Sequence, residues 1–205
     1  MKKNVATKTK DKNNDKVMNA QETNHSCSSC CRSVGMTLAA LAVLASISIA
    51  RASEDNRAPD LPSPLCDRLQ VQGGKVAFHV YALGVQIYRW NGASWVFVAP
   101  AARLFADPEY HGEVGIHYAG PTWESNSGGK VVASRVDSCA PDPTAIAWLL
   151  LQKVSSEGPG IFDRVTFIQR VNTAGGLPPS GPGPFVGAEE QVPYTAEYYF
   201  YRDQH

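Results

Sequence analysis

Two polar side chains and a tryptophan lie close together in the segment HYAGPTWE. They are His117, Trp123 and Glu124, and the Gly-Pro pair between them predicts a turn that brings all three to one rim. A histidine and a glutamate together can act as general acid and base. A tryptophan beside polar groups can instead stack on a sugar or an aromatic ligand. The structural alternative is a Trp123 buried over the turn, with His117 and Glu124 bonded to backbone.

A second polar group ends the run FIQRVNTAGG. Arg170 has the planar fork that binds a carboxylate, either that of Glu124 or that of an anionic ligand. Alternation along a strand puts Arg170 and Asn172 on one face, whereas Gln169 points the other way and is expected to be a buried, satisfied amide. The predicted binding rim therefore consists of His117, Trp123, Glu124, Arg170 and Asn172.

Metal and covalent chemistry find little support in the sequence. His111, Glu113 and His117 share a face if YHGEVGIHY is a strand, but the two histidines would then lie roughly 20 Å apart, far beyond the reach of one ion. The run CSSCC precedes the apolar residues 36–50 in the first part of the chain, where no fold is expected that could hold a metal. The chain has no G-x-S-x-G nucleophile motif. We therefore predict no metal site and no cofactor.

Short alternating runs must position these residues. In KVAFHVY, the side chains of Val76, Phe78 and Val80 are expected on one face. Asn91-Gly92 predicts a hairpin, and Gly-Gly pairs separate later runs. This pattern predicts an all-β, single-domain antiparallel sandwich or barrel. One segment, TAIAWLLLQKV, is compatible with a short helix near 144–154 or with a strand buried on both faces.

The end of the chain is rich in aromatic residues. In YTAEYYFY, alternation places Tyr199 and Tyr201 opposite Tyr194, Tyr198 and Phe200, so both faces are aromatic. Such a pattern is typical of a central, well-covered strand. Before it, residues 173–193 form a long Gly/Pro loop, which is either functional or a flexible insertion.

Charge divides the chain into two parts. Its 205 residues have a formal net charge of zero, with 19 Lys+Arg and 19 Asp+Glu. Basic residues predominate over residues 1–52, and acidic residues predominate in the rest, which also contains every aromatic residue and every proline. An acidic body argues against nucleic acid as a partner.

The first part has the features of an export signal. Residues 1–52 combine a long basic region, an apolar run over 36–50 and a small-x-small site ending at Ala52. The run is shorter than the roughly 20 residues of a transmembrane helix. We predict a cleaved leader, disordered or helical, and a secreted or periplasmic protein. The alternative is an uncleaved anchor, which would be the protein's only membrane contact.

The second part consists of a Pro-rich linker over 53–64 and a β-rich domain over 65–205. It contains two cysteines, Cys66 and Cys139. In an oxidising compartment these two can form a disulfide, provided that the fold brings their Cα atoms together.

Five motifs occur in a characteristic order, namely GVQIYRW, HYAGPTWE, AWLLLQKV, FIQRVNTAGG and VPYTAEYYFY. Over about residues 61–201 the chain resembles a family of secreted bacterial, fungal and plant proteins with a domain of unknown function. The resemblance implies secretion and one compact β-rich domain, without an established activity. Members often have a cysteine after the Gly-Gly pair that this chain lacks, so a family disulfide pattern does not transfer.

Some fungal members of that family are labelled malate dehydrogenase. A nicotinamide site of the doubly wound kind requires G-x-G-x-x-G between a strand and a helix. No such segment occurs in this chain, so we reject dehydrogenase activity.

Three functions remain as hypotheses. The leading one is non-catalytic binding of a small molecule or carbohydrate at the predicted rim. The second is a hydrolase or lyase that uses His117 and Glu124 as acid and base. The third is a structural envelope or surface protein.

Overall fold

The computed structural model describes residues 57–204, so the predicted leader and the start of the predicted linker lie outside the described residues. A short 3-10 helix, η1 (Asp67–Leu69), precedes the sheet. No helix in this range has the length and hydropathy that a membrane span requires. The strands are β1 (Gly74–Trp90), β2 (Trp95–Phe105), β3 (Glu113–Tyr118), β4 (Thr122–Ser125), β5 (Lys130–Cys139), β6 (Trp148–Glu157), β7 (Phe167–Gly175) and β8 (Glu189–Asp203).

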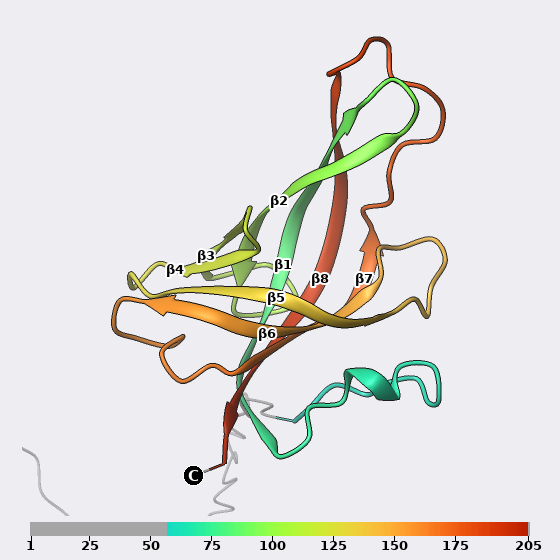
Figure 1. Ribbon diagram of the computed structural model, residues 1–205. Coiled ribbons are helices and arrows are strands. Elements are labelled where there is room, and N and C mark those ends of the chain that lie inside the picture. The colour runs from blue at the N-terminus through green and yellow to red at the C-terminus, as the bar shows by residue number, and fades with distance from the viewer. Residues whose placement is uncertain (1–56, 205) are drawn as a thin grey trace, which may run out of the picture. The chain divides into compact units, whose positions relative to one another are not determined.

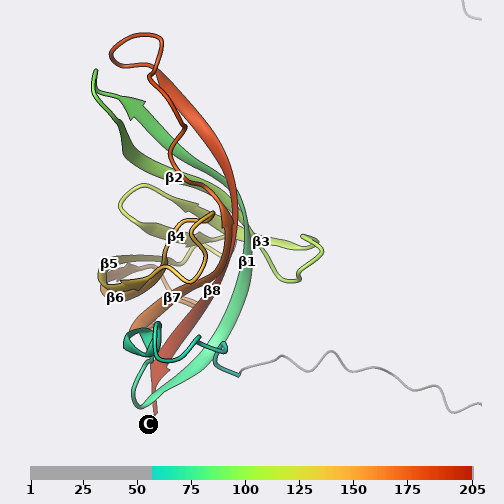
Figure 2. The same ribbon diagram turned by 90° about the vertical axis from the view of Figure 1, so that its right-hand side faces the viewer.

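These strands form one closed antiparallel barrel. Each strand pairs with the next in sequence, and β8 pairs with β1 to close the ring. In Figure 1, β1, β2 and β8 extend together past the shorter strands, and Figure 2 shows how strongly β1 and β8 curve. The predicted all-β antiparallel fold is confirmed, in its barrel form. A barrel of eight strands has an interior that side chains fill or that admits one small ligand.

Alternate side chains of each strand fill the barrel interior. Phe200 of β8 lies at the centre of an aromatic cluster, with ring centroids 4.5 Å from Phe78, 5.3 Å from Phe162 and 6.1 Å from Trp123. Burying one such large apolar side chain stabilises the fold by roughly 1.5–3 kcal/mol. The buried interior residues are Val80, Ala82, Ala102, Leu104, Trp123, Val131, Ala133, Ile146, Leu151, Phe162, Val165, Ile168, Tyr194, Ala196, Tyr198 and Phe200.

A second apolar cluster lies outside the barrel, under the segment that precedes β1. Leu69 of η1 is fully buried there against Tyr199 and Tyr201. Since Tyr198 and Phe200 point into the barrel, β8 is covered on both faces, as its aromatic pattern predicted. The cluster consists of Cys66, Leu69, Val76, Cys139, Trp148, Leu150, Val171, Tyr199 and Tyr201.

A disulfide and a pair of hydrogen bonds attach this segment to the barrel. Cys66 and Cys139, at the end of β5, form a disulfide with their Cα atoms 5.4 Å apart. The Gln169 amide donates to the Leu69 carbonyl at 2.6 Å and accepts from the Tyr201 hydroxyl at 2.5 Å. Gln169 is 1% exposed, which confirms the prediction of a buried, satisfied amide.

The structure decides one open alternative and corrects one expectation about local structure. Near 144–154 the strand alternative is confirmed and the helix is not present, because residues from Trp148 onward form β6. Leu149 and Leu151 face the interior while Trp148 and Leu150 join the outer cluster, so both faces are apolar and periodicity alone could not identify the strand. Val76 does not share a face with Phe78 and Val80, because a bulge interrupts the β1–β8 register between Val76 and Phe78.

The long Gly/Pro loop is anchored to the tip of the β1–β2 hairpin. Residues 176–188 connect the end of β7 to the start of β8. The Trp95 indole donates to the Gly181 carbonyl at 2.9 Å, and the Gly187 amide donates to the Trp90 carbonyl at 2.8 Å. The loop therefore packs along the hairpin, and its ends are fixed by backbone bonds.

Candidate functional site

A cavity of about 200 Å³ lies within the barrel, and all eight strands contribute to its walls. Three residues of the predicted rim line it, namely His117, Trp123 and Arg170. The other lining residues are Gln86, Phe97, Val98, Pro100, Gly120, Pro121, Arg135, Leu149, Leu151 and Tyr198.

His117 and Trp123 form one wall of the cavity. They are directly opposite each other in the β3–β4 ladder, so both side chains point inward. Their rings stack with centroids 4.3 Å apart and planes 14° apart. Tyr198 meets the tryptophan edge-on at 5.3 Å. One ring face of Trp123 is thus covered, and only 1% of the residue is exposed.

His117 is held in one neutral form. Its Nδ1 lies 2.8 Å from the Thr122 carbonyl, and because a carbonyl only accepts, Nδ1 carries the proton. Burial lowers the pKa of His117 to about 3; the bond to Thr122 opposes this shift and the charge of Arg170 adds to it. At neutral pH the ring therefore has an Nε2 lone pair and no charge.

Arg170 brings a positive charge into the barrel. It is paired with Leu149 in β6 and with Tyr198 in β8, which directs its side chain inward. Its Nε and Nη2 donate to the Ala147 carbonyl at 3.2 and 2.7 Å. Within residues 57–204, no carboxylate forms an ion pair with it. Arg170 is half-buried, and a charge partly withdrawn from water without a counter-ion is destabilising.

The same cavity is lined by two residues with unpaired donor atoms. Among the described residues, the buried side-chain atoms without a hydrogen-bond partner are Gln86 Nε2 and Trp123 Nε1. A buried donor left without a partner costs about 1–3 kcal/mol. Together with Arg170 they make the cavity rich in donors, which suits a ligand that supplies acceptor oxygens.

Glu124 does not belong to this cavity. In the β3–β4 ladder it is paired with Ile116, so its side chain lies on the face opposite His117 and Trp123. Its carboxylate accepts from the Tyr118 hydroxyl at 2.8 Å. The structure therefore brings Glu124 neither to His117, as an acid–base pair would need, nor to Arg170 as an ion-pair partner.

Asn172 also lies away from Arg170. The β7–β8 register shifts between Val171 and Ala174, and Asn172 adopts a positive φ of 49°. Its exposed side chain donates to Glu197 at 3.0 Å. The expectation of one shared face was wrong because the bulge interrupts the alternation.

The residues of the zinc interpretation are dispersed. His111 precedes β3 and is exposed, whereas Glu113 forms an ion pair with Arg103 on the barrel surface. Across the described part of the chain, no three His, Cys, Asp or Glu side chains gather closely enough to hold a metal ion.

Sequence reasoning missed Gln86 and set aside Tyr198. Gln86 is 2% exposed in β1, four positions after the interior residue Ala82. Extending the alternation of Val80 and Ala82 along the strand would have predicted an inward amide. Tyr198 was assigned only a packing role, since nothing in its own strand reveals that Arg170 is its neighbour.

The fold and the cavity define a small meandering antiparallel barrel whose interior holds a mainly apolar cavity with a few hydrogen-bond donors in its walls. The chain belongs to the DUF3455 family, described as a protein of unknown function, whose model matches residues 71–202. This match confirms the family resemblance and spans nearly the whole barrel. Neither the curated proteins nor the solved structures gave a match to the chain.

Proposed function

We propose that this barrel is a non-catalytic binding protein for a small organic carboxylate, held at Arg170. The observation that carries the proposal is the inward guanidinium, which no carboxylate of residues 57–204 neutralises. A ligand carboxylate would supply the missing charge and form charge-assisted hydrogen bonds.

The rest of the cavity supports the same ligand class. The unpaired Nε2 of Gln86 and Nε1 of Trp123 are further donors for carboxylate or carbonyl oxygens. Leu149, Leu151 and Pro121 supply apolar wall. A volume of about 200 Å³ is below the common range of roughly 300–1,000 Å³ for ligand pockets, so the ligand must be small. A stacked sugar is less well supported, because His117 already covers one face of the Trp123 ring.

A hydrolase or lyase receives less support from this site. His117 is uncharged and Glu124 lies on the other face of the sheet. The remaining groups can bind and orient a ligand but do not form an acid–base pair.

Titration with benzoate tests the proposal. We expect benzoate to quench or shift tryptophan fluorescence with saturation, and benzyl alcohol, which lacks the charge, to bind at least tenfold more weakly. Arg170→Met should weaken benzoate at least tenfold, because a hydrogen bond to a charged group contributes about 1.5–3 kcal/mol. Arg103→Met, which removes an exposed arginine, is the matched control.

Trp123→Phe separates donation from packing. It keeps an aromatic ring and removes the indole N–H, so benzoate affinity should fall severalfold while the fold persists. Equal benzoate affinity in wild-type, Arg170→Met and Trp123→Phe proteins would show that the cavity is not the site. Saturable binding of glucose in place of benzoate would favour the carbohydrate alternative.

We also propose that the protein is secreted or periplasmic. The Cys66–Cys139 disulfide supports this location, because disulfides persist in oxidising compartments. N-terminal sequencing of the exported protein should begin at Ser53. A mature chain that begins at Met1 would instead favour the uncleaved anchor.

A further inference from the structure

A larger cavity, of about 760 Å³, lies beside the connection from β6 to β7. In β1 it reaches Phe78 and Val80, whereas the cavity around Arg170, proposed above to bind a carboxylate, reaches Gln86 further along the same strand. Its walls are largely apolar: Phe78 of β1 stacks on Phe200 of the neighbouring strand β8 with ring centroids 4.5 Å apart, and Leu104 of β2 lies in the same apolar cluster. This cavity is therefore distinct from the one around Arg170.

The β6–β7 connection shapes this cavity. Phe162 is buried, and its ring centroid lies 5.8 Å from that of Phe78. This contact holds the connection against the end of the barrel. Ile161, beside it, is 50% exposed. The cavity thus has an aromatic floor and an apolar edge that reaches solvent.

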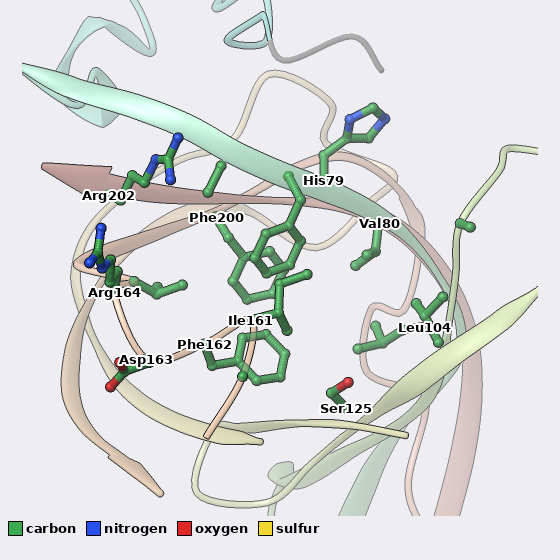
Figure 3. Close-up of a pocket in the computed structure, with 16 residues that line it drawn as sticks. His79, Val80, Leu104, Ser125, Ile161, Phe162, Asp163, Arg164, Phe200 and Arg202 are labelled. Carbon is green, nitrogen blue, oxygen red and sulfur yellow. The ribbon is translucent and has the colours of Figure 1, made fainter. Parts of the chain in front are cut away.

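Two arginines border the apolar walls. In Figure 3, the side chains of Arg164 and Arg202 lie on one side of the cavity, away from Val80 and Leu104. Their backbones are held together because the Thr166 amide donates to the Tyr201 carbonyl at 2.8 Å. In the described chain, neither arginine takes part in an ion pair.

Both arginines also line an adjoining polar cavity of about 1090 Å³. Lys75 and Lys153 line it as well, and among the described lining residues Asp203 is the one carboxylate. Among the described residues of the apolar cavity, Asp163 is the acidic one. Cations of residues 57–204 thus outnumber carboxylates of the same range here, although acidic residues predominate in the chain beyond residue 52.

We propose that the two adjoining cavities bind one single-chain amphiphile with an anionic head group. Its head would lie between Arg164 and Arg202, where the polar cavity begins, and its hydrocarbon chain would lie against Phe78, Leu104 and Phe200. An apolar cavity that opens onto unpaired guanidinium groups provides both the burial and the charge that such a ligand needs. This inference does not depend on the carboxylate site at Arg170.

A fluorescence titration with cis-parinaric acid tests the inference, since this fatty acid becomes fluorescent in apolar surroundings. We expect saturable binding by the full chain and displacement by dodecanoate. Octanoate should displace more weakly, by up to about three- to fourfold for each buried methylene lost. Dodecanol, which lacks the charge, should compete at least tenfold more weakly than dodecanoate, and inorganic phosphate should not compete.

Charge variants locate the head group. The double variant Arg164→Ala/Arg202→Ala should weaken cis-parinaric acid at least tenfold, and both residues are exposed, so the fold should persist. The double variant Arg89→Ala/Arg103→Ala removes the same charge from two exposed surface sites and should leave affinity unchanged. Arg170→Met should also leave it unchanged, which separates this site from the carboxylate site.

Four results would overturn the inference. They are no saturable binding, equal affinity of the two double variants, equal competition by dodecanol and dodecanoate, and binding only to vesicles that contain anionic lipid. The last result would mean that the basic cluster attracts a charged surface rather than a single amphiphile.

Discussion

The chemistry open to His117 is decided by where its ring lies. In the sequence, His117 lies in the same short segment as Glu124 and was a candidate acid or base. In the barrel it is 3% exposed and bonded to the Thr122 carbonyl. The ring therefore stays neutral through the physiological pH range. It forms part of the cavity wall, and its Nε2 can accept a hydrogen bond.

The pH dependence of stability should reveal this neutral histidine. The folded pKa of about 3 is below the ordinary value of 6.5, so below pH 6.5 the unfolded chain takes up a proton that the folded chain does not. The neutral His117 therefore contributes to the free energy of unfolding. That contribution is fully present above pH 6.5 and is lost as the pH falls toward 3, by at most about 1.4 kcal/mol per pH unit. Between pH 7 and pH 5, wild-type protein should lose about 1–2 kcal/mol more stability than His117→Gln in urea unfolding.

His111→Gln is the matched control for that experiment. His111 is exposed, so its variant should follow the wild-type dependence on pH. If His117→Gln and wild-type curves have the same slope, the histidine is not held neutral by burial.

At the scale of single elements, alternation was informative wherever a strand is regular. It placed Tyr198 and Phe200 opposite Tyr199 and Tyr201 correctly, because β8 has no irregularity there. It misplaced Val76 and Asn172, and both lie at shifts in the register. A bulge adds one residue without a marker in the pattern, so every face assigned across it is reversed.

The backbone conformation at the β7 bulge should destabilise the fold when a β-branched side chain occupies position 172. Asn172 has a positive φ of 49°, which asparagine and glycine tolerate and β-branched residues do not. Asn172→Val should therefore lower the free energy of unfolding by about 1–2 kcal/mol, whereas Asn172→Gly should change it much less. Urea unfolding measures both.

Ser134→Val provides the comparison, because Ser134 is an exposed residue of β5 and valine suits strands. It should leave stability nearly unchanged. Equal stability of Asn172→Val and Ser134→Val would contradict the strained backbone.

For the whole molecule, the sequence predicted strands but left a sandwich and a barrel open. Closure depends on β1 pairing with β8, whose ladder joins Gly74 to Asp203. No local pattern reports on a pairing between residues so far apart in sequence. The same limit applies to the site, since Arg170 of β7 and His117 of β3 line one cavity only because the sheet is closed.

The disulfide should be a large part of the stability of the barrel. It joins residues 73 positions apart, and a loop of this length corresponds to about 4 kcal/mol on the chain-entropy model. Reduction should lower the free energy of unfolding by roughly this amount in urea. The Cys66→Ala/Cys139→Ala protein should match reduced wild-type protein and be insensitive to reductant; unchanged wild-type stability on reduction would contradict this account.

The same disulfide determines where mechanical load enters the barrel. Without it, tension on the chain ahead of Cys66 would be held only by noncovalent contacts such as those of Leu69, and once these gave way it would separate the first residues of β1 from β8 one hydrogen bond at a time. The covalent link passes that tension to Cys139, at the end of β5. Load is thus carried into the far side of the sheet, and the β1–β8 seam that closes the ring is shielded from peeling.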